Sequence, residues 1–246
     1  MGGLVEMKSG KAKTRQPGSR EKRLGIAWPR PTQFKVPIPR DETQRLKALH
    51  RYNILDTPPD ETFDSVAMLA SHVCDTPIAL MVLIDRDRQW FKAKVGVRVR
   101  ETPREFAFCA YTIMQRRLLI VPDTTQDKRF AANPFVATGP KYRFYAGAPL
   151  VTRDNRALGT LCVIDKVRRT LSPAQKKDLV ALSRLAMKEL ELRRGLRDMR
   201  GSGVRSSGRN AIIRPAAEAN GLTHSELKRR HAAKRARPNF LGTNPD

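Results

Sequence analysis

Two amphipathic helices are predicted where apolar residues recur at helical spacing, starting near position 41. Residues 41–54 form the first helix, with Asp41 as a candidate N-cap. The helix ends before Pro58 and Pro59, because proline cannot continue it. Asp60 can cap the second helix. The apolar stripe of that helix falls at i, i+3, i+4 and i+7 and comprises Phe63, Val66, Ala67, Ala70 and Val73.

The apolar period then drops to two, which is typical of strands. Residues 78–84 predict a buried strand, and a polar turn at 85–87 leads to a second strand from Gln89. In this second strand one face carries Phe91, Ala93 and Val95. The opposite face carries Trp90, Lys92 and Lys94.

The rest of the folded part reads as a helix, three strands and a closing helix. A short helix is predicted around 108–115, then a strand in 118–123, a long loop, and two strands within 142–165 joined by the turn 152–156. Ser172 caps the closing helix with Pro173 at its first position. The order α–α–β–β–α–β–β–β–α predicts an α+β domain with an antiparallel sheet and helices packed against it.

Charge divides the 246-residue chain into three parts, although its formal net charge is +24 as a whole. Residues 1–40, with five prolines, carry ten basic and two acidic side chains, and residues 193–246 carry thirteen and four. We therefore expect a largely disordered basic extension (1–40), one folded domain (41–194) and a flexible basic tail (195–246). Such tails associate with polyanions non-specifically through counterion release, so a nucleic-acid-associating protein is one alternative function.

The three cysteines form no CxxC pair, and their odd number argues against a disulfide framework. The chain has no signal-peptide pattern and no uninterrupted apolar run of membrane-spanning length. These observations predict a cytoplasmic protein with no membrane association. His72 and Cys74 lie two apart on a helix and face different ways, so no metal site is expected. The sequence leaves any cofactor unknown.

Several segments, taken together and in order, resemble GAF domains, and most closely the bacterial subgroup attached to sensor histidine kinases and diguanylate cyclases. They are "LDTPPDETFD", "PIALMVLIDRDRQWFKAKVG", "ETPREFAFCAYTI", "VPDTTQDKRFAANPFV", "YRFYAGAPL" and "LGTLCVID". The resemblance covers roughly residues 42–194. It implies a GAF-like (profilin-like or PAS-like) antiparallel sheet of five to six strands, helices packed on one face, and a small-molecule pocket on the other.

The same resemblance implies a sensory module rather than an enzyme. We expect it to bind a small molecule or a protein partner and to relay the signal through its terminal helices. The first and last helices, on one side of the sheet, are the expected homodimer surface. The chain departs from relatives at Tyr111, where the subgroup usually has histidine, and at Ala110, where bilin-binding members have histidine after the cysteine. No kinase or cyclase output is recognised, so a stand-alone domain is expected.

Eight residues are the candidates for the ligand pocket, because aromatic walls with a few polar groups are how small-ligand sites are built. They are Phe108, Cys109, Tyr111, Thr112, Asp123, Arg129, Phe130 and Tyr145. The alternative is that Asp123 and Arg129 form a loop-fixing ion pair and the aromatic residues fill the core.

Cys109 has two interpretations. It shares a helix face with apolar residues, which favours packing, and free cysteine is commonly buried. A reactive thiolate needs a positive neighbour or a helix start, which Arg104 and the local helix could supply. A redox enzyme of the GAF fold, of the free methionine sulfoxide reductase type, is therefore the second alternative function, although no resolving cysteine is recognised.

Overall fold

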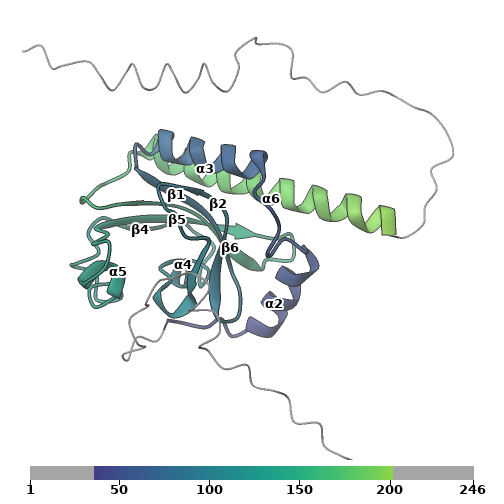
Figure 1. The fold of residues 1–246 in the computed structure, drawn as a ribbon, viewed down its shortest axis with the longest axis horizontal. Helices are drawn as coiled ribbons and strands as arrows, with labels where there is room; N and C mark the ends of the chain where they lie inside the picture. Colours follow the sequence, from purple (N-terminus) through teal and green to yellow (C-terminus); the bar gives the residue numbers. More distant parts are fainter. Residues whose placement is uncertain (1–35, 202–246) are drawn as a thin grey trace, which may run out of the picture. The chain divides into compact units, whose positions relative to one another are not determined.

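The computed structural model describes residues 36–201, and the predictions for residues 1–35 and 202–246 lie outside that range. A six-stranded antiparallel sheet with the order β3-β2-β1-β6-β5-β4 forms its centre (Figure 1). The strands are β1 (Ile78–Ile84), β2 (Arg88–Val95), β3 (Glu101–Pro103), β4 (Leu119–Val121), β5 (Phe144–Val151) and β6 (Ala157–Asp165). The helices are α2 (Glu42–Arg51), α3 (Glu61–Val73), α4 (Cys109–Thr112), α5 (Pro134–Ala137) and α6 (Pro173–Gly201), with a 3-10 turn, η1, at Arg104–Phe106.

The predicted fold class is confirmed: an α+β domain built on an antiparallel sheet of six strands. Strand β3 was not predicted, because its three residues, Glu-Thr-Pro, form no apolar run, whereas the equally short β4 stands out by its apolar residues. Helix α6 also continues beyond the predicted end at position 194. Gly195 does not stop it, since one glycine inside a helix costs only about 1 kcal/mol and leucine, arginine and methionine around it are good helix formers.

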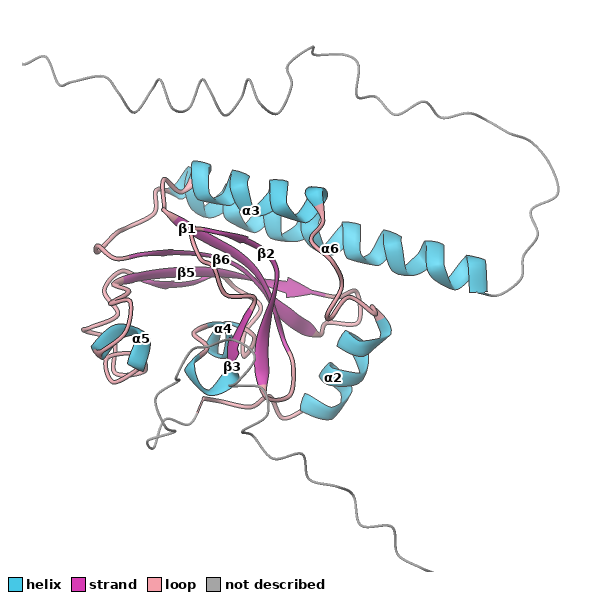
Figure 2. Ribbon diagram, viewed as in Figure 1, coloured by secondary structure: helices cyan, strands magenta, loops and turns pink. Residues whose placement is uncertain are grey.

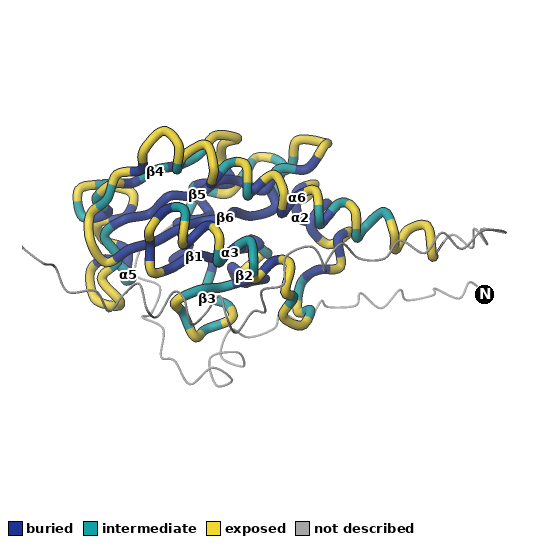
Figure 3. The backbone as a smooth tube through the Cα atoms, turned by 90° about the horizontal axis from the view of Figure 1, so that it is seen from above, coloured by how far each residue is buried: buried dark blue, intermediate teal, exposed yellow. Residues whose placement is uncertain are grey.

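Each face of the sheet has its own apolar layer, because alternate residues of every strand point to opposite sides. The two long helices, α3 and α6, lie together on one face, over a cluster that includes Met81, Phe144 and Leu161 (Figure 2). The prediction placed helices on one face only, but the short helices α4 and α5 lie on the other face. There Leu80 and Cys162 belong to a second cluster. The strands between the layers are buried almost throughout (Figure 3).

Helix α2 lies at the end of the sheet, and α3 is the helix that packs along α6 (Figure 1). The expectation that the first and last helices share one side of the sheet is therefore wrong, because α3 and not α2 lies beside α6 there.

Local capping explains where two of the helices begin. The Asp60 carboxylate accepts a hydrogen bond from the Thr62 backbone N–H at 3.1 Å, as predicted for the α3 N-cap. Ser172 and Gln175 form a reciprocal capping box at the start of α6, with contacts of 2.9 and 3.2 Å. Asp41 makes no side-chain cap at α2, because its carboxylate pairs instead with Arg156.

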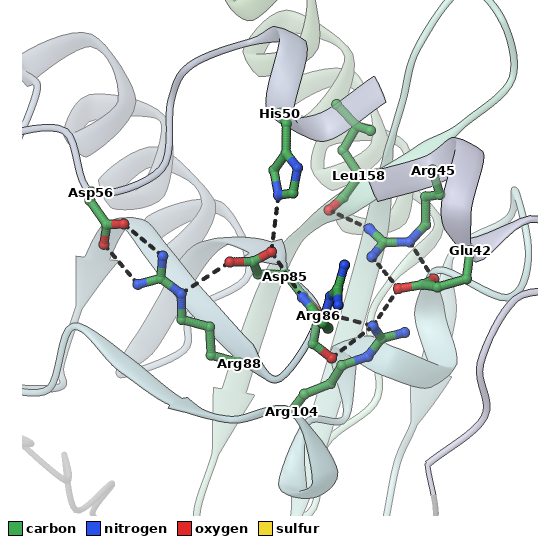
Figure 4. A network of polar contacts seen from close by, with 9 residues as sticks. All are labelled: Glu42, Arg45, His50, Asp56, Asp85, Arg86, Arg88, Arg104 and Leu158. Atoms are coloured by element: carbon green, nitrogen blue, oxygen red, sulfur yellow. Dashed lines mark hydrogen bonds and ion pairs between the residues drawn. The ribbon is translucent and has the colours of Figure 1, made fainter. Parts of the chain in front are cut away.

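A network of ion pairs fixes α2 to the sheet (Figure 4). The Glu42 carboxylate accepts two hydrogen bonds from Arg45, both 2.8 Å, and one from Arg104 at 2.5 Å. Both guanidinium groups are buried. Burial disfavours the Glu42 carboxylate, but these charged donors outweigh it and lower the pKa of Glu42 from 4.5 to about 2. The same network includes the ion pair between Arg88 and Asp85. The β1–β2 turn is therefore held by Arg88 as well as by Arg104, which donates to the Asp85 carbonyl.

Candidate functional site

A pocket of about 350 Å³ opens on the sheet face that carries α4 and α5. Its floor is formed by alternate residues of β1 and β2 and by one residue each of β5 and β6, and its walls come from β3 and the β2–β3 connection, α4, α5 and the segment after α5. The size lies at the lower end of the range for small-molecule sites. The lining comprises Ile78, Leu80, Gln89, Phe91, Gly96, Val97, Arg98, Val99, Thr102, Phe108, Cys109, Phe135, Pro140, Tyr142, Tyr145, Ile164 and Lys166.

Gln89 places an unpaired acceptor in this mostly apolar lining. Its Nε2 donates to Thr102 Oγ1 at 2.5 Å, whereas its Oε1 is buried and has no hydrogen-bond partner among the described residues. The side chain is only 6% exposed. A buried amide oxygen left unsatisfied costs about 1–3 kcal/mol, so a ligand that donates a hydrogen bond there would recover that energy.

The rim of the pocket is positively charged. Arg98 and Lys166 line it and are exposed, and none of the lining residues is Asp or Glu. A carboxylate or phosphate at this rim would meet two cations with no competing anion in the lining.

A chain of polar contacts runs from α4 to β6 beneath the pocket. Thr112 Oγ1 and the Tyr145 hydroxyl are 2.6 Å apart, the Tyr145 hydroxyl donates to Cys109 Sγ at 3.5 Å, and Cys109 Sγ lies 3.7 Å from Cys162 Sγ. All four side chains are buried, and burial raises the pKa of Tyr145 well above its usual value. Burial acts against the Cys109 thiolate, but hydrogen bonds from Cys162 and Tyr145 outweigh it, so the pKa of Cys109 is lowered.

This chain of contacts corrects two expectations about Cys109. Arg104 is not its positive neighbour, since its guanidinium is engaged by Glu42 and by the Asp85 carbonyl at 3.0 Å. A second thiol that sequence reasoning did not find, Cys162, lies against it.

Of the eight predicted pocket residues, Phe108, Cys109 and Tyr145 line the pocket. Three more stand directly behind this wall. Thr112 holds Tyr145, and Phe130 packs edge-on against Phe108 and Tyr111, with ring centroids 4.8 and 4.9 Å apart.

Asp123 and Arg129 do not line the pocket, and the structure does not bring them together as an ion pair. Asp123 pairs with Arg168 at 2.8 Å and accepts two hydrogen bonds from Thr125. Arg129 pairs with Asp127 at 2.6 Å. The carboxylates of Asp123 and Asp127 therefore stabilise loops. The alternative interpretation also gave the charged residues this role, but it paired Asp123 with Arg129.

Sequence reasoning missed the polar residues that matter most in the pocket: Gln89, Thr102, Arg98 and Lys166. The sequence did contain a signal for Gln89. It lies two positions before Phe91 in the predicted strand, so its polar side chain is expected on the same face as apolar neighbours. Arg98 and Lys166 follow strand ends, and Thr102 lies in the short strand β3, so no period indicates where these three side chains point.

Residues 58–190 match the family described as GAF domain, which is more than half of the chain. A cyclic di-GMP phosphodiesterase of Pseudomonas aeruginosa is 41% identical over 150 residues, covering 61% of this chain. The match covers 25% of that curated relative, so the chain spans about a quarter of the relative's length.

Solved GAF domains resemble the structure at low sequence identity. The PixJ GAF domain of Thermosynechococcus elongatus, in its blue-light absorbing form, has a TM-score of 0.49 and 14% identity, covering 65% of this chain and 94% of that one. The GAF domain of an Acinetobacter phosphoenolpyruvate-protein phosphotransferase has a TM-score of 0.47 and 16% identity, covering 63% and 98%.

These findings confirm the predicted GAF-type signalling module at the level of the family. They also correct one expectation: the prediction that the protein is no enzyme is wrong by this comparison, because the 41% identical relative is named an enzyme. No helix within residues 36–201 is both long enough and apolar enough to cross a membrane.

Proposed function

The chain belongs to the GAF domain family, and we propose on that basis that its pocket binds a small organic anion whose occupancy is the signal. One observation carries this proposal: the Gln89 Oε1 acceptor is buried and unpaired in the lining of an otherwise apolar pocket. The ligand would have a flat apolar body against Phe91 and Phe108, a donor for Gln89, and a negative group at the Arg98 and Lys166 rim.

A direct test begins with native mass spectrometry of the freshly purified full-length protein, which reports any retained compound. Thermal shift measurements then compare 4-hydroxybenzoate with two matched probes, benzoate, which lacks the hydroxyl donor, and 4-hydroxybenzamide, which lacks the charge. We expect the first probe to raise the melting temperature most. Gln89→Leu should remove its advantage over benzoate, because the acceptor is gone. No retained compound and no shift with any of the three probes would contradict the proposal.

Signal relay is proposed to run through the sheet to α6. Strand β5 supplies Tyr145 to the pocket side and Phe144 to the layer under α6, so a change at the pocket reaches both faces. The far end of α6 extends beyond the sheet (Figure 1) and carries an exposed apolar stripe. Its members, with exposed fractions of 42–59%, are Leu185, Leu192, Leu196 and Met199.

Spacings of seven, four and three residues along this stripe favour a coiled-coil homodimer. Sedimentation velocity should show a dimer for the full-length protein and a monomer for the double variant Leu192→Glu/Leu196→Glu. Val167→Glu is the matched control, since that side chain is equally exposed but lies outside the helix. A wild-type monomer at all concentrations would refute the dimer.

The relative's name suggests which activity the module regulates. We propose that the domain controls turnover of cyclic di-GMP, since the 41% identity covers the folded domain. The pocket, at about 350 Å³, fits a one-ring anion better than a molecule built from two guanosine nucleotides, so cyclic di-GMP is proposed as the regulated substrate and not as the pocket ligand. Hydrolysis of cyclic di-GMP, followed by chromatography with the full chain alone and with the pocket occupied, tests this link.

A further inference from the structure

Two of the three thiols meet beneath the pocket. Cys109 on α4 and Cys162 on β6 are 53 positions apart in the chain, and their Sγ atoms are 3.7 Å apart. Both cysteines are free and buried, and Cys109 also forms part of the pocket lining. A small molecule in the pocket therefore reaches one sulfur of the pair directly.

We propose that Cys109 and Cys162 form a disulfide when a small hydroperoxide enters the pocket. The sulfur atoms would have to approach to about 2.0 Å, which is a movement of less than 2 Å from the distance in the structure. Strand β6 is held by β1 and β5 on its two sides, whereas α4 is a helix of four residues with no side-chain cap. Closure therefore requires a shift of α4 and leaves the sheet in place.

The surroundings favour Cys109 as the sulfur that reacts first. The Tyr145 hydroxyl, held by Thr112, donates a hydrogen bond to Cys109 Sγ and stabilises its thiolate. Cys162 faces Cys109 but does not line the pocket. Tyr145 is a positioning residue here, since it acts through the sulfur and does not itself change oxidation state.

The reaction balances in two steps. The Cys109 thiol loses its proton as its sulfur attacks the outer peroxide oxygen, the S–O bond forms as the O–O bond breaks, and the released alkoxide takes up that proton to leave as alcohol, or as water from hydrogen peroxide. Cys162 Sγ then attacks the Cys109 sulfenic acid, the S–S bond forms, and the hydroxyl leaves with the Cys162 proton as water. Two thiols lose two electrons and one hydroperoxide gains them.

Cys74 provides a matched internal control. It lies in the layer on the opposite face of the sheet, away from the pocket, and burial raises the pKa of its thiol from 9.0 to about 11. It is free and buried like the other two, but it differs from Cys109 in its position and in its raised thiol pKa. We expect hydroperoxide to modify the pair at least about tenfold faster than Cys74.

The experiment uses the full-length protein, reduced, desalted and exposed to hydrogen peroxide or tert-butyl hydroperoxide. Intact mass should fall by two hydrogen atoms, and trypsin should release a cross-link between residues 105–116 and 157–166. Cys74, in the separate peptide 52–86, should stay reduced. Cys74→Ser should form the same cross-link, and in Cys162→Ser the sulfenic acid of Cys109 should be trapped by dimedone.

Three results would overturn the inference: no cross-link in the folded wild-type protein, a cross-link only after unfolding in urea, or oxidation of Cys74 as fast as of the pair. If the serine variants do not fold, the cross-link mapped in the wild type and in Cys74→Ser still decides the matter. The inference also fails separately from the proposed ligand, because probe binding is measured with the protein reduced.

Discussion

Replacing both members of the Gln89–Thr102 pair by apolar residues of similar shape should stabilise the protein. The pair's own hydrogen bond contributes about 1 kcal/mol, whereas the unpaired Gln89 Oε1 costs about 1–3 kcal/mol. The double variant Gln89→Leu/Thr102→Val removes both, so we expect the free energy of unfolding to rise by about 1 kcal/mol. The melting temperature should rise by about 3 °C. An increase in stability on substitution is expected when the native residue is kept for binding although it destabilises the fold.

Urea unfolding followed by circular dichroism measures this difference, provided that the m-value is unchanged. Thr112→Val is the matched control: it also removes a buried threonine hydroxyl, but one fully paired with Tyr145 at 2.6 Å. It should lower the free energy of unfolding by about 1 kcal/mol. If the Gln89/Thr102 double variant is destabilised as much as Thr112→Val, then Gln89 Oε1 is satisfied in the free protein and the argument for a ligand donor fails.

Two further predictions test the network at α2 and the packing of the pocket wall. Glu42→Gln should cost about 2–3 kcal/mol at pH 7, because it leaves two buried guanidinium groups short of a counter-charge. Since the pKa of Glu42 is about 2 when folded against 4.5 ordinarily, that stability is present above pH 4.5 and lost towards pH 2, so the difference from wild type should shrink over that range. Glu61→Gln, at an exposed glutamate that also begins a helix, should leave the free energy of unfolding at pH 7 nearly unchanged. Gly147→Ala should cost about 1–3 kcal/mol, because the added Cβ would stand 2.2 Å from the Tyr145 hydroxyl. Gly195→Ala in α6, where an added Cβ would meet no atom within 4 Å, should instead stabilise the protein by about 0.5–1 kcal/mol. The urea midpoint should therefore fall for Gly147→Ala and rise for Gly195→Ala, each relative to wild type.

The helices and most strands could be predicted because their signals are local. The stripe beginning at Phe63, the cap at Asp60 and the apolar run 78–84 each depend on residues a few positions apart, and the structure confirms all three. The capping sequence at Ser172 marked the start of α6 for the same reason. Strand β3 was not predicted because its three residues include no apolar run.

The candidate site was predicted only in part. Phe108, Cys109 and Tyr145 were found because an aromatic-lined cavity was expected between the short helix and the strand that carries Tyr145. The expected convergence of Asp123 with Arg129 does not occur in the structure. Asp123 pairs with Arg168 and Arg129 pairs with Asp127, and the sequence does not indicate which of the possible partners each charged group takes. Among the described residues, ion pairs such as Arg104–Glu42 join segments 62 positions apart.

The sequence by itself determined the elements, their faces and the family, because periodicity, caps and prolines act between near neighbours. Only the tertiary structure decided that β6 lies between β1 and β5, which places Cys162 against Cys109 and closes the pocket floor with residues from four strands. That choice depends on strand order and register, set by the summed burial of two apolar layers across the whole sheet, and no short stretch of the chain contains it.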